Sequence, residues 1–188
     1  GSKSPYELNI TYVDALRETG DDDALHVQRF LASQAIMLIL PGVPAVYIHS
    51  LLGSHNWEEG VAQTGRARTI NRQELRYEDV RAELEDDTSF RAMAYTGYCR
   101  LLKARCNEPA FHPNAAFEIL TAPDEVFALR RNHAGRAVAA FINVSAKEIA
   151  VPLPECGCSS SAEAIAGSPR ITNSVLTLSA YDVVWLRY

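Results

Sequence analysis

The chain has 188 residues, of which 47% are hydrophobic and 22% charged, a composition typical of a folded protein with one or two domains and a substantial core. Its formal net charge is −5, and no run of lysine or arginine forms the basic stripe that a nucleic-acid partner requires. Its apolar segments are too short to span a bilayer, so we expect neither a nucleic acid nor a membrane as a partner.

The first elements follow a helical period. Residues 11–17 predict a short helical turn, and apolar residues recur at helical spacing over 24–40. The acidic residues 21–23 are suited to the positive end of that helix, and Pro41 predicts its end. Residues 43–48 form a short continuous apolar run, which is typical of a strand buried on both faces in a parallel sheet. We therefore expect one helix–strand step of a β/α barrel.

A polar segment and a second helix follow. Residues 50–74 show no periodicity, and an irregular loop of this length is uncommon in a compact domain unless it has a function. Residues 89–106 predict an amphipathic helix, with acidic residues before it and basic residues near its end. These elements form the predicted first domain, residues 1–109.

From residue 110 the period changes to two. This pattern predicts a separate antiparallel β-domain over residues 110–188, arranged as a sandwich, with a hairpin turn at 132–135. The predicted strands are 115–120, 126–131, 137–143, 148–153, 175–178 and 183–188.

The four cysteines indicate the compartment. Cys156 and Cys158 are separated by one residue, which is not the common spacing of zinc or redox sites, so we expect a plain loop there. Cys99 and Cys106 fall in a helical pattern as core or boundary residues. Because the chain opens without an apolar leader, we expect reduced thiols and a cytoplasmic protein.

Two segments carry a resemblance to a known family. The stretch LPGVPAVYIHSLLGSHNWEEGVAQTGRARTINR, residues 40–72, and the preceding YELNITYVDAL resemble the C-terminal part of glycoside hydrolase family 13, in its sucrose phosphorylase-like branch. The pattern HSL…GS…TGRAR…INR is most similar to the glucosylglycerate phosphorylases of that branch. The resemblance implies an α/β plus all-β fold, in which the end of a (β/α)8 TIM barrel is followed by an antiparallel β-sandwich.

The resemblance also implies an activity for the longer parent protein. Family members use an aspartate nucleophile, a glutamate acid/base and a third carboxylate on earlier barrel strands, and none has a match in this chain. The chain is then an inactive fragment of a retaining phosphorylase, which transfers a glucosyl unit between phosphate and a small acceptor such as glycerate or fructose. The implied partners are a small sugar or glucosyl phosphate and inorganic phosphate, with no metal or organic cofactor.

The site residues follow from the same resemblance. Arg68 matches an arginine that contacts the glucosyl hydroxyls, and Tyr6 matches a tyrosine on a mobile loop near the phosphate or acceptor. Arg66 adds a cation that suits a small anionic acceptor. The predicted substrate-binding residues are Arg68, Tyr6, Arg66, His55, Asn56 and Glu7.

Other functions remain open from the sequence. The parent could be a family 13 hydrolase, or the β-domain could be a non-catalytic carbohydrate-binding module or scaffold. A single barrel strand with its helices leaves apolar faces uncovered, so we also expect the residues before Pro109 either to form a homodimer through these faces or to rearrange.

Overall fold

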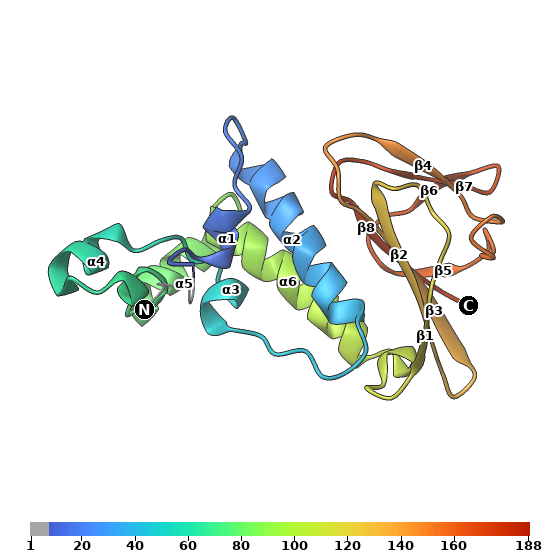
Figure 1. Ribbon diagram of the computed structural model, residues 1–188, viewed down its shortest axis with the longest axis horizontal. Helices are drawn as coiled ribbons and strands as arrows, with labels where there is room; N and C mark the ends of the chain where they lie inside the picture. The colour runs from blue at the N-terminus through green and yellow to red at the C-terminus, as the bar shows by residue number, and fades with distance from the viewer. Residues whose placement is uncertain (1–7) are drawn as a thin grey trace, which may run out of the picture. The chain divides into compact units, whose positions relative to one another are not determined.

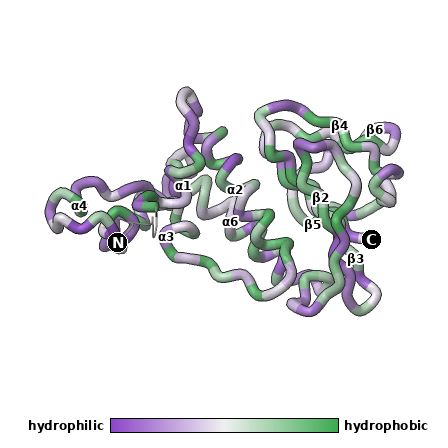
Figure 2. The backbone as a smooth tube through the Cα atoms, viewed as in Figure 1, coloured by the Kyte–Doolittle hydropathy of each residue, from purple (hydrophilic) through white to green (hydrophobic). Residues whose placement is uncertain are grey.

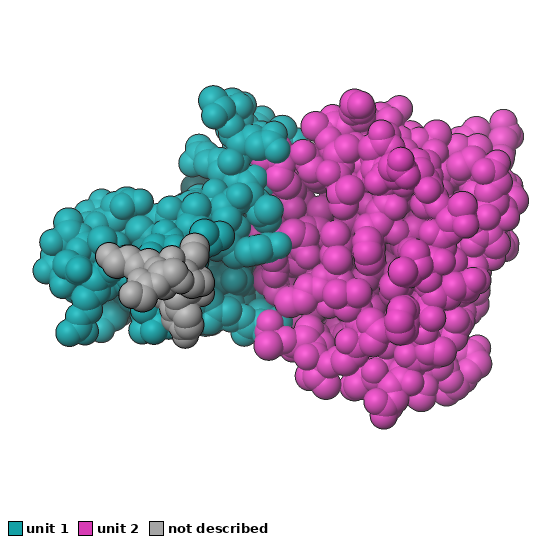
Figure 3. All heavy atoms as spheres, viewed as in Figure 1, with its two compact units in different colours: residues 1–26, 46–95 teal, residues 27–45, 96–188 magenta. Residues whose placement is uncertain are grey.

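The computed structural model describes residues 8–188, which divide into two compact units (Figure 3). One unit holds the residues up to His26 together with Val46–Tyr95, and the other holds Val27–Ala45 and Thr96–Tyr188. Helices α2 (Asp23–Ile39) and α6 (Phe90–Cys106) contribute residues to both units. The predicted domain boundary at residue 109 stays a prediction.

The two long helices are confirmed, and both begin at side-chain caps. Asp22 Oδ1 accepts a hydrogen bond from Leu25 N at 2.8 Å at the start of α2. Ser89 Oγ accepts one from Ala92 N at 3.0 Å at the start of α6. Such caps satisfy amide groups that have no partner within the first turn. Within residues 8–188, neither these nor any other helix has the length and apolar character needed to cross a membrane.

The first unit is built from short helices (Figure 1). The predicted turn at 11–17 is confirmed, and Thr11 caps it by accepting a hydrogen bond from Asp14 N at 3.3 Å. The other helices of this unit that lie wholly within it have only four to nine residues, too few for a long apolar stripe. Besides the first turns of α2 and α6, the unit contains α1 (Tyr12–Ala15), α3 (Ile48–Leu51), α4 (Glu58–Thr64), the 3-10 helix η1 (Ala67–Asn71) and α5 (Tyr77–Glu85).

Two predictions in this region are wrong. The expected strand at 43–48 is absent: residues 43–47 have no regular structure, and Val43 and Ile48 are 81% and 54% exposed. A strand needs neighbours that accept its backbone hydrogen bonds, and no strand among residues 8–188 pairs with this segment. The expected loop at 50–74 instead contains the end of α3, all of α4 and η1, because helices of so few turns carry no readable apolar period.

The second unit contains two antiparallel sheets (Figure 1). Their orders are β1-β2-β3-β8-β5 and β4-β7-β6, which confirms the expected antiparallel domain. The hairpin is also confirmed, since Ala134 and Gly135 both have positive φ between β2 and β3. Strands β5 and β6 were not predicted, because runs of four and three residues are too short to show a readable period. The strands are β1 (Ala116–Ile119), β2 (Val126–His133), β3 (Arg136–Asn143), β4 (Ile149–Pro152), β5 (Glu163–Ala166), β6 (Arg170–Thr172), β7 (Val175–Leu178) and β8 (Val183–Arg187).

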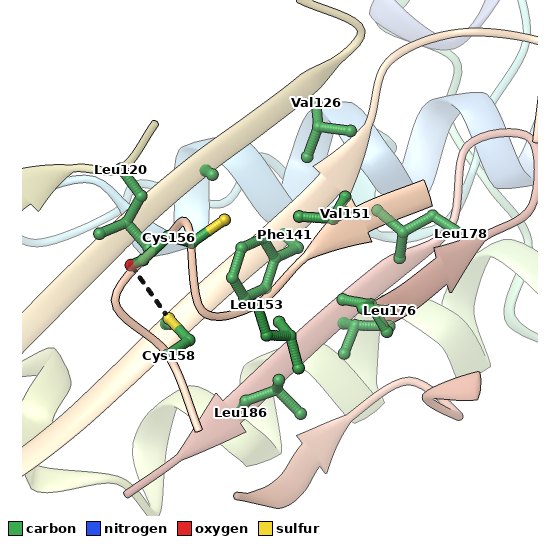
Figure 4. Packing of buried hydrophobic residues seen from close by; sticks show 13 residues of the cluster. Leu120, Val126, Phe141, Val151, Leu153, Cys156, Cys158, Leu176, Leu178 and Leu186 are labelled. Carbon is green, nitrogen blue, oxygen red and sulfur yellow. Dashed lines mark hydrogen bonds between the residues drawn. The ribbon is translucent and has the colours of Figure 1, made fainter. Parts of the chain in front are cut away.

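Side chains from both sheets form one hydrophobic core (Figure 4). Phe141 of β3 and Leu176 of β7 are both fully buried in it, as expected for a sandwich. Cys156 and Cys158 belong to the same core, and burial raises the pKa of the Cys156 thiol. All four cysteines are unpaired. Figure 2 shows that much of the hydrophobic sequence in this unit lies on its strands, with hydrophilic residues at most turns.

Two buried arginines connect the end of α2 to the rest of the second unit. Arg131 on β2 is fully buried and donates to Ile39 O and to His112 O, each at 2.8 Å. Arg105 on α6 donates to Leu38 O and, at 2.8 Å, to Gly42 O. The last carbonyl groups of a helix have no partner within the helix. The two guanidinium groups supply these missing donors.

We expect Arg131→Met to lower the free energy of unfolding by roughly 2–4 kcal/mol, because the buried Ile39 carbonyl and the partly buried His112 carbonyl would lose a charged donor. Denaturant unfolding followed by circular dichroism measures this change. Arg136→Met is the matched control, since Arg136 is an exposed arginine on the adjoining strand. Equal stability of the two variants would contradict the role given to Arg131.

Candidate functional site

Arg66 and Arg68 line a groove of about 760 Å³ in the first unit. The turn that presents them begins where α4 ends at Gly65, which has a φ of +66°. Residues other than glycine rarely adopt this conformation. The Thr64 and Thr69 hydroxyl oxygens lie 2.8 Å apart, and Thr64 Oγ1 also accepts from Arg66 N at 3.3 Å. The groove is lined by Asn9, Trp57, Thr64, Arg66, Ala67, Arg68, Thr69, Arg72 and Glu74.

The described residues that line the groove carry more positive than negative charge. They include three arginines, Arg66, Arg68 and Arg72, and one carboxylate, that of Glu74. Arg66 and Arg68 are exposed, so their guanidinium groups can reach a ligand. Guanidinium groups bind phosphate, carboxylate and paired sugar oxygens through two parallel hydrogen bonds. The groove volume also lies in the range of small-molecule sites.

Trp57 forms an aromatic wall of this groove. Its backbone N donates to Ile70 O at 2.8 Å, which joins the start of α4 to η1. Its ring lies directly on Gly60, where an added Cβ would stand 2.2 Å from the nearest ring atom. Only glycine therefore allows the ring to pack at this place on α4.

The structure places His55 and Asn56 in a neighbouring cluster rather than among the lining residues of the groove. His55 Nδ1 lies 2.5 Å from Asp14 Oδ1. Asn56 N donates to Asp14 Oδ2 at 2.7 Å, and Asn56 Oδ1 accepts from Thr11 N at 2.7 Å. We call Thr11, Asp14, His55 and Asn56 the Asp14 cluster. Tyr6 and Glu7 lie outside the described residues.

Sequence reasoning missed Asp14 as the centre of this cluster. Burial raises the pKa of Asp14, but hydrogen bonds from His55 and from Asn56 N, together with nearby histidine charge, lower it below its ordinary value. The spacing of Thr11 and Asp14 is a helix-start signal. No signal in the sequence links Asp14 to a histidine 41 positions away.

His49 lies in a second pocket of the first unit, of about 350 Å³, together with Tyr47 and Asn71. His49 Nδ1 is 3.1 Å from Ser54 Oγ. Burial and the positive charge of Arg91 lower the pKa of His49 below its ordinary value. Its imidazole is therefore neutral at neutral pH, so it can accept or donate one hydrogen bond per nitrogen.

Metal binding has no support in the described part of the chain. No group of three His, Cys, Asp or Glu side chains within residues 8–188 is arranged to hold an ion. The described polar groups that line the groove are guanidinium, amide and hydroxyl groups and the Glu74 carboxylate, which can bind and orient a ligand.

Curated proteins similar to this chain include glucosylglycerate phosphorylases and sucrose phosphorylases. The chain is 52% identical over 143 residues to the glucosylglycerate phosphorylase of Spirochaeta thermophila, covering 75% of this chain and 24% of that protein. It is 39% identical over 146 residues to the glucosylglycerate phosphorylase of Escherichia coli, covering 77% and 26%. A sucrose phosphorylase of Agrobacterium vitis is 36% identical over 116 residues, covering 62% and 21%. The chain spans about a quarter of the length of these relatives.

Solved structures with a similar fold are glycoside hydrolase family 13 enzymes. The α-glucosyl transfer enzyme XgtA matches 95% of this chain and 38% of its own, with a TM-score of 0.65 and 17% identity. The trehalulose synthase MutB from Pseudomonas mesoacidophila matches 85% and 38%, with a TM-score of 0.63 and 15% identity. These likenesses show the fold, and they confirm the predicted combination of barrel end and β-domain. No protein-family model matches the chain.

We expect Gly60→Ala to displace the Trp57 ring, because the new methyl group would overlap it. The indole N–H resonance of Trp57 should shift in the variant. The chain contains two tryptophans, and Trp185 in the other unit serves as the internal reference. Ala62→Ser, at an exposed position of the same helix, should leave both resonances in place. An unchanged Trp57 resonance in Gly60→Ala would contradict the packing described here.

We expect His49 to titrate below its ordinary pKa of 6.5, because burial and Arg91 disfavour the imidazolium. A folded-state pKa below the unfolded value means that the unfolded chain binds more protons in this range. The contribution of His49 to stability is therefore present above pH 6.5 and is lost as the pH falls below it. NMR titration of histidine Cε1 protons gives the pKa, and Arg91→Gln should raise it. A midpoint at or above 6.5 would contradict this.

Proposed function

The chain is homologous to a quarter of the length of glucosylglycerate phosphorylases, enzymes of glycoside hydrolase family 13, and we propose that it is the C-terminal segment of such a phosphorylase. The parent protein would transfer a glucosyl unit between phosphate and a small acceptor such as glycerate or fructose, with retention of configuration. The observation that carries this proposal is the 52% identity to the Spirochaeta thermophila enzyme.

The chemistry would be divided between this chain and the rest of its parent. Retaining enzymes of this type use one carboxylate as nucleophile and another as acid and base, through a covalent glucosyl intermediate. We place these carboxylates in the preceding part of the parent. By itself, this chain would bind without turning over substrate. We also propose a cytoplasmic location, which is compatible with four unpaired cysteines.

The arginine groove would bind the charged and hydroxylated parts of the substrates. Arg68 would hold two oxygens of the glucosyl unit through its guanidinium fork. Arg66 would bind the phosphate group or the acceptor carboxylate. Tyr6 and Glu7 would approach the same ligand from the preceding loop. His55 and Asn56 have polar atoms already engaged with Asp14 and Thr11, so they would act mainly through the shape of the site.

A carbohydrate-binding β-domain is less well supported. Binding modules of that kind display exposed aromatic side chains on one face. Phe111, Phe141, Tyr181 and Trp185 are all buried in the second unit, whereas Phe117 and Tyr188 are 55% and 39% exposed. The aromatic residues thus act mainly as core.

Exposed apolar residues point to a covering partner. Val43, Tyr47 and Ile48 are 81%, 50% and 54% exposed, which is unusual for neighbouring large apolar side chains. We propose that the preceding part of the parent covers these side chains, and that strands of that part pair with residues 43–47. In its absence a second copy of the chain would cover the same residues as a homodimer.

We expect the isolated chain to leave α-glucose 1-phosphate and glycerate unchanged, and the full-length parent to consume both and release phosphate. Phosphate release, measured with each of glycerate, fructose, glycerol and water as acceptor, tests the assignment. Turnover by the isolated chain would contradict the placement of the carboxylates. A parent that releases glucose with water alone would be a hydrolase.

In the parent, Arg68→Ala should lower kcat/KM by about 10- to 100-fold, the loss expected when one or two hydrogen bonds to a charged donor are removed. Arg66→Ala should instead raise KM for phosphate. This increase in KM should be smaller at high salt, because salt screens the attraction between exposed charges. The matched control is Arg76→Ala, since the Arg76 side chain is 78% exposed and pairs with Asp79. If all three variants behaved alike, the groove would not be the substrate site.

A further inference from the structure

The Asp14 cluster joins two segments that are far apart in sequence. Its three long-range hydrogen bonds have lengths of 2.5, 2.7 and 2.7 Å and connect residues 41 to 45 positions apart. They tie α1 to the segment just before α4. Both segments belong to the first unit. The link is therefore a property of this unit alone.

Each side of the cluster continues into a wall of the arginine groove. Asn9 lines the groove and lies two residues before Thr11. Trp57 lines it too and directly follows Asn56. A backbone of one or two residues leaves little freedom between a fixed anchor and its neighbour. The separation of Asn9 from Trp57 thus depends on the hydrogen bonds of the cluster.

The Asp14 carboxylate is well suited to such a link. Its side chain is 17% exposed, and each of its two oxygens has a hydrogen-bond partner. The pKa of Asp14 lies below its ordinary value, so the group is ionised at neutral pH. Neutral His55 can donate from Nδ1, and the contact therefore does not require a protonated imidazole.

The cluster is supported from behind by packed rings. His55 packs against Phe90 with tilted rings whose centroids are 4.5 Å apart, and the centroid of the His26 ring lies 4.9 Å from that of Phe90. His26 is 1% exposed and its Nε2 donates to Val13 O at 2.8 Å, within α1. This ring contact holds His55 against α6 while Asp14 holds it against α1. The arrangement resists displacement in both directions.

We propose that Asp14 is a positioning residue, which sets the separation of Asn9 from Trp57 through His55 and Asn56 and thereby shapes the arginine groove for its anionic ligand. The ligand part of this inference rests on the proposed function; the geometric part does not. Asp14 is not a catalytic residue, because both of its oxygens are occupied by protein donors. Its effect on a ligand would pass through the groove walls.

The test uses the ¹⁵N-labelled 188-residue chain in four variants and one control. Asp14→Asn replaces one acceptor oxygen by an amino group, so one hydrogen bond of the cluster is lost. His55→Ala and His55→Asn both remove the ring from Phe90, but asparagine keeps an N–H donor. Asp14→Asn combined with His55→Ala completes the set. Asp87→Asn is the control, since Asp87 is exposed before α6.

Two quantities are measured for each protein. The first is the resonance positions of the Trp57 indole N–H and the Asn9 amide without ligand, with Trp185 as reference. The second is the affinity for inorganic phosphate and for α-glucose 1-phosphate, from titration of the same resonances. We expect Asp14→Asn and His55→Ala to shift both reporters and to weaken binding about tenfold, as for one lost hydrogen bond to a charged group. His55→Asn should recover most of the affinity, and the double variant should lose little more than either single variant.

The outcomes separate the two claims. If Trp57 and Asn9 keep their positions in folded Asp14→Asn, or if His55→Asn behaves like His55→Ala, the positioning role is overturned. If wild-type chain shows no response to either ligand, the proposed function of the groove fails, and the ligand-free shifts still decide the positioning role. If Asp14→Asn does not fold, the comparison of the two His55 variants decides it.

Discussion

The end of α2 depends on two buried guanidinium groups. A helix leaves its last carbonyl groups without partners, and here Leu38 O and Ile39 O are met by Arg105 and Arg131. Burying an arginine is costly unless its donors are engaged. Arg131 meets this condition only in part: its two terminal nitrogens donate to Ile39 O and His112 O, whereas its buried Nε has no partner among residues 8–188. One pair of side chains thus joins a helix end, a strand and the connection into the β-domain, all within the second unit.

The first unit is stabilised by a different kind of contact. Its short helices cannot be stable by themselves, and their arrangement depends on a few long-range hydrogen bonds. The Asp14 cluster and the contact of Trp57 N with Ile70 O are the main ones that shape the groove. Exposed arginines carry the charge, and exposed or partly buried polar contacts lie beside them. A division between binding groups and supporting contacts is common at sites on loops.

Residues 43–48, which follow α2, show that an apolar sequence alone does not make a strand. Val43 and Ile48 have the apolar character of a buried strand but are exposed, because a strand is defined by its neighbours. The antiparallel strands of the second unit contain their own partners and form complete sheets. The chain matches about a quarter of its phosphorylase relatives. We propose that strands in a longer parent protein would be the neighbours of residues 43–48.

The sequence by itself determined the long helices and most strands, because periodicity, capping residues and turn residues act locally. It identified Arg66 and Arg68 through a family resemblance, and the structure places both at one groove. Only the tertiary structure decided that residues 43–48 do not form a strand and that His55 forms a hydrogen bond with Asp14. Both features depend on groups that are distant in sequence. A strand needs partner strands, and the hydrogen bond between two residues 41 positions apart forms only when folding brings these two residues together.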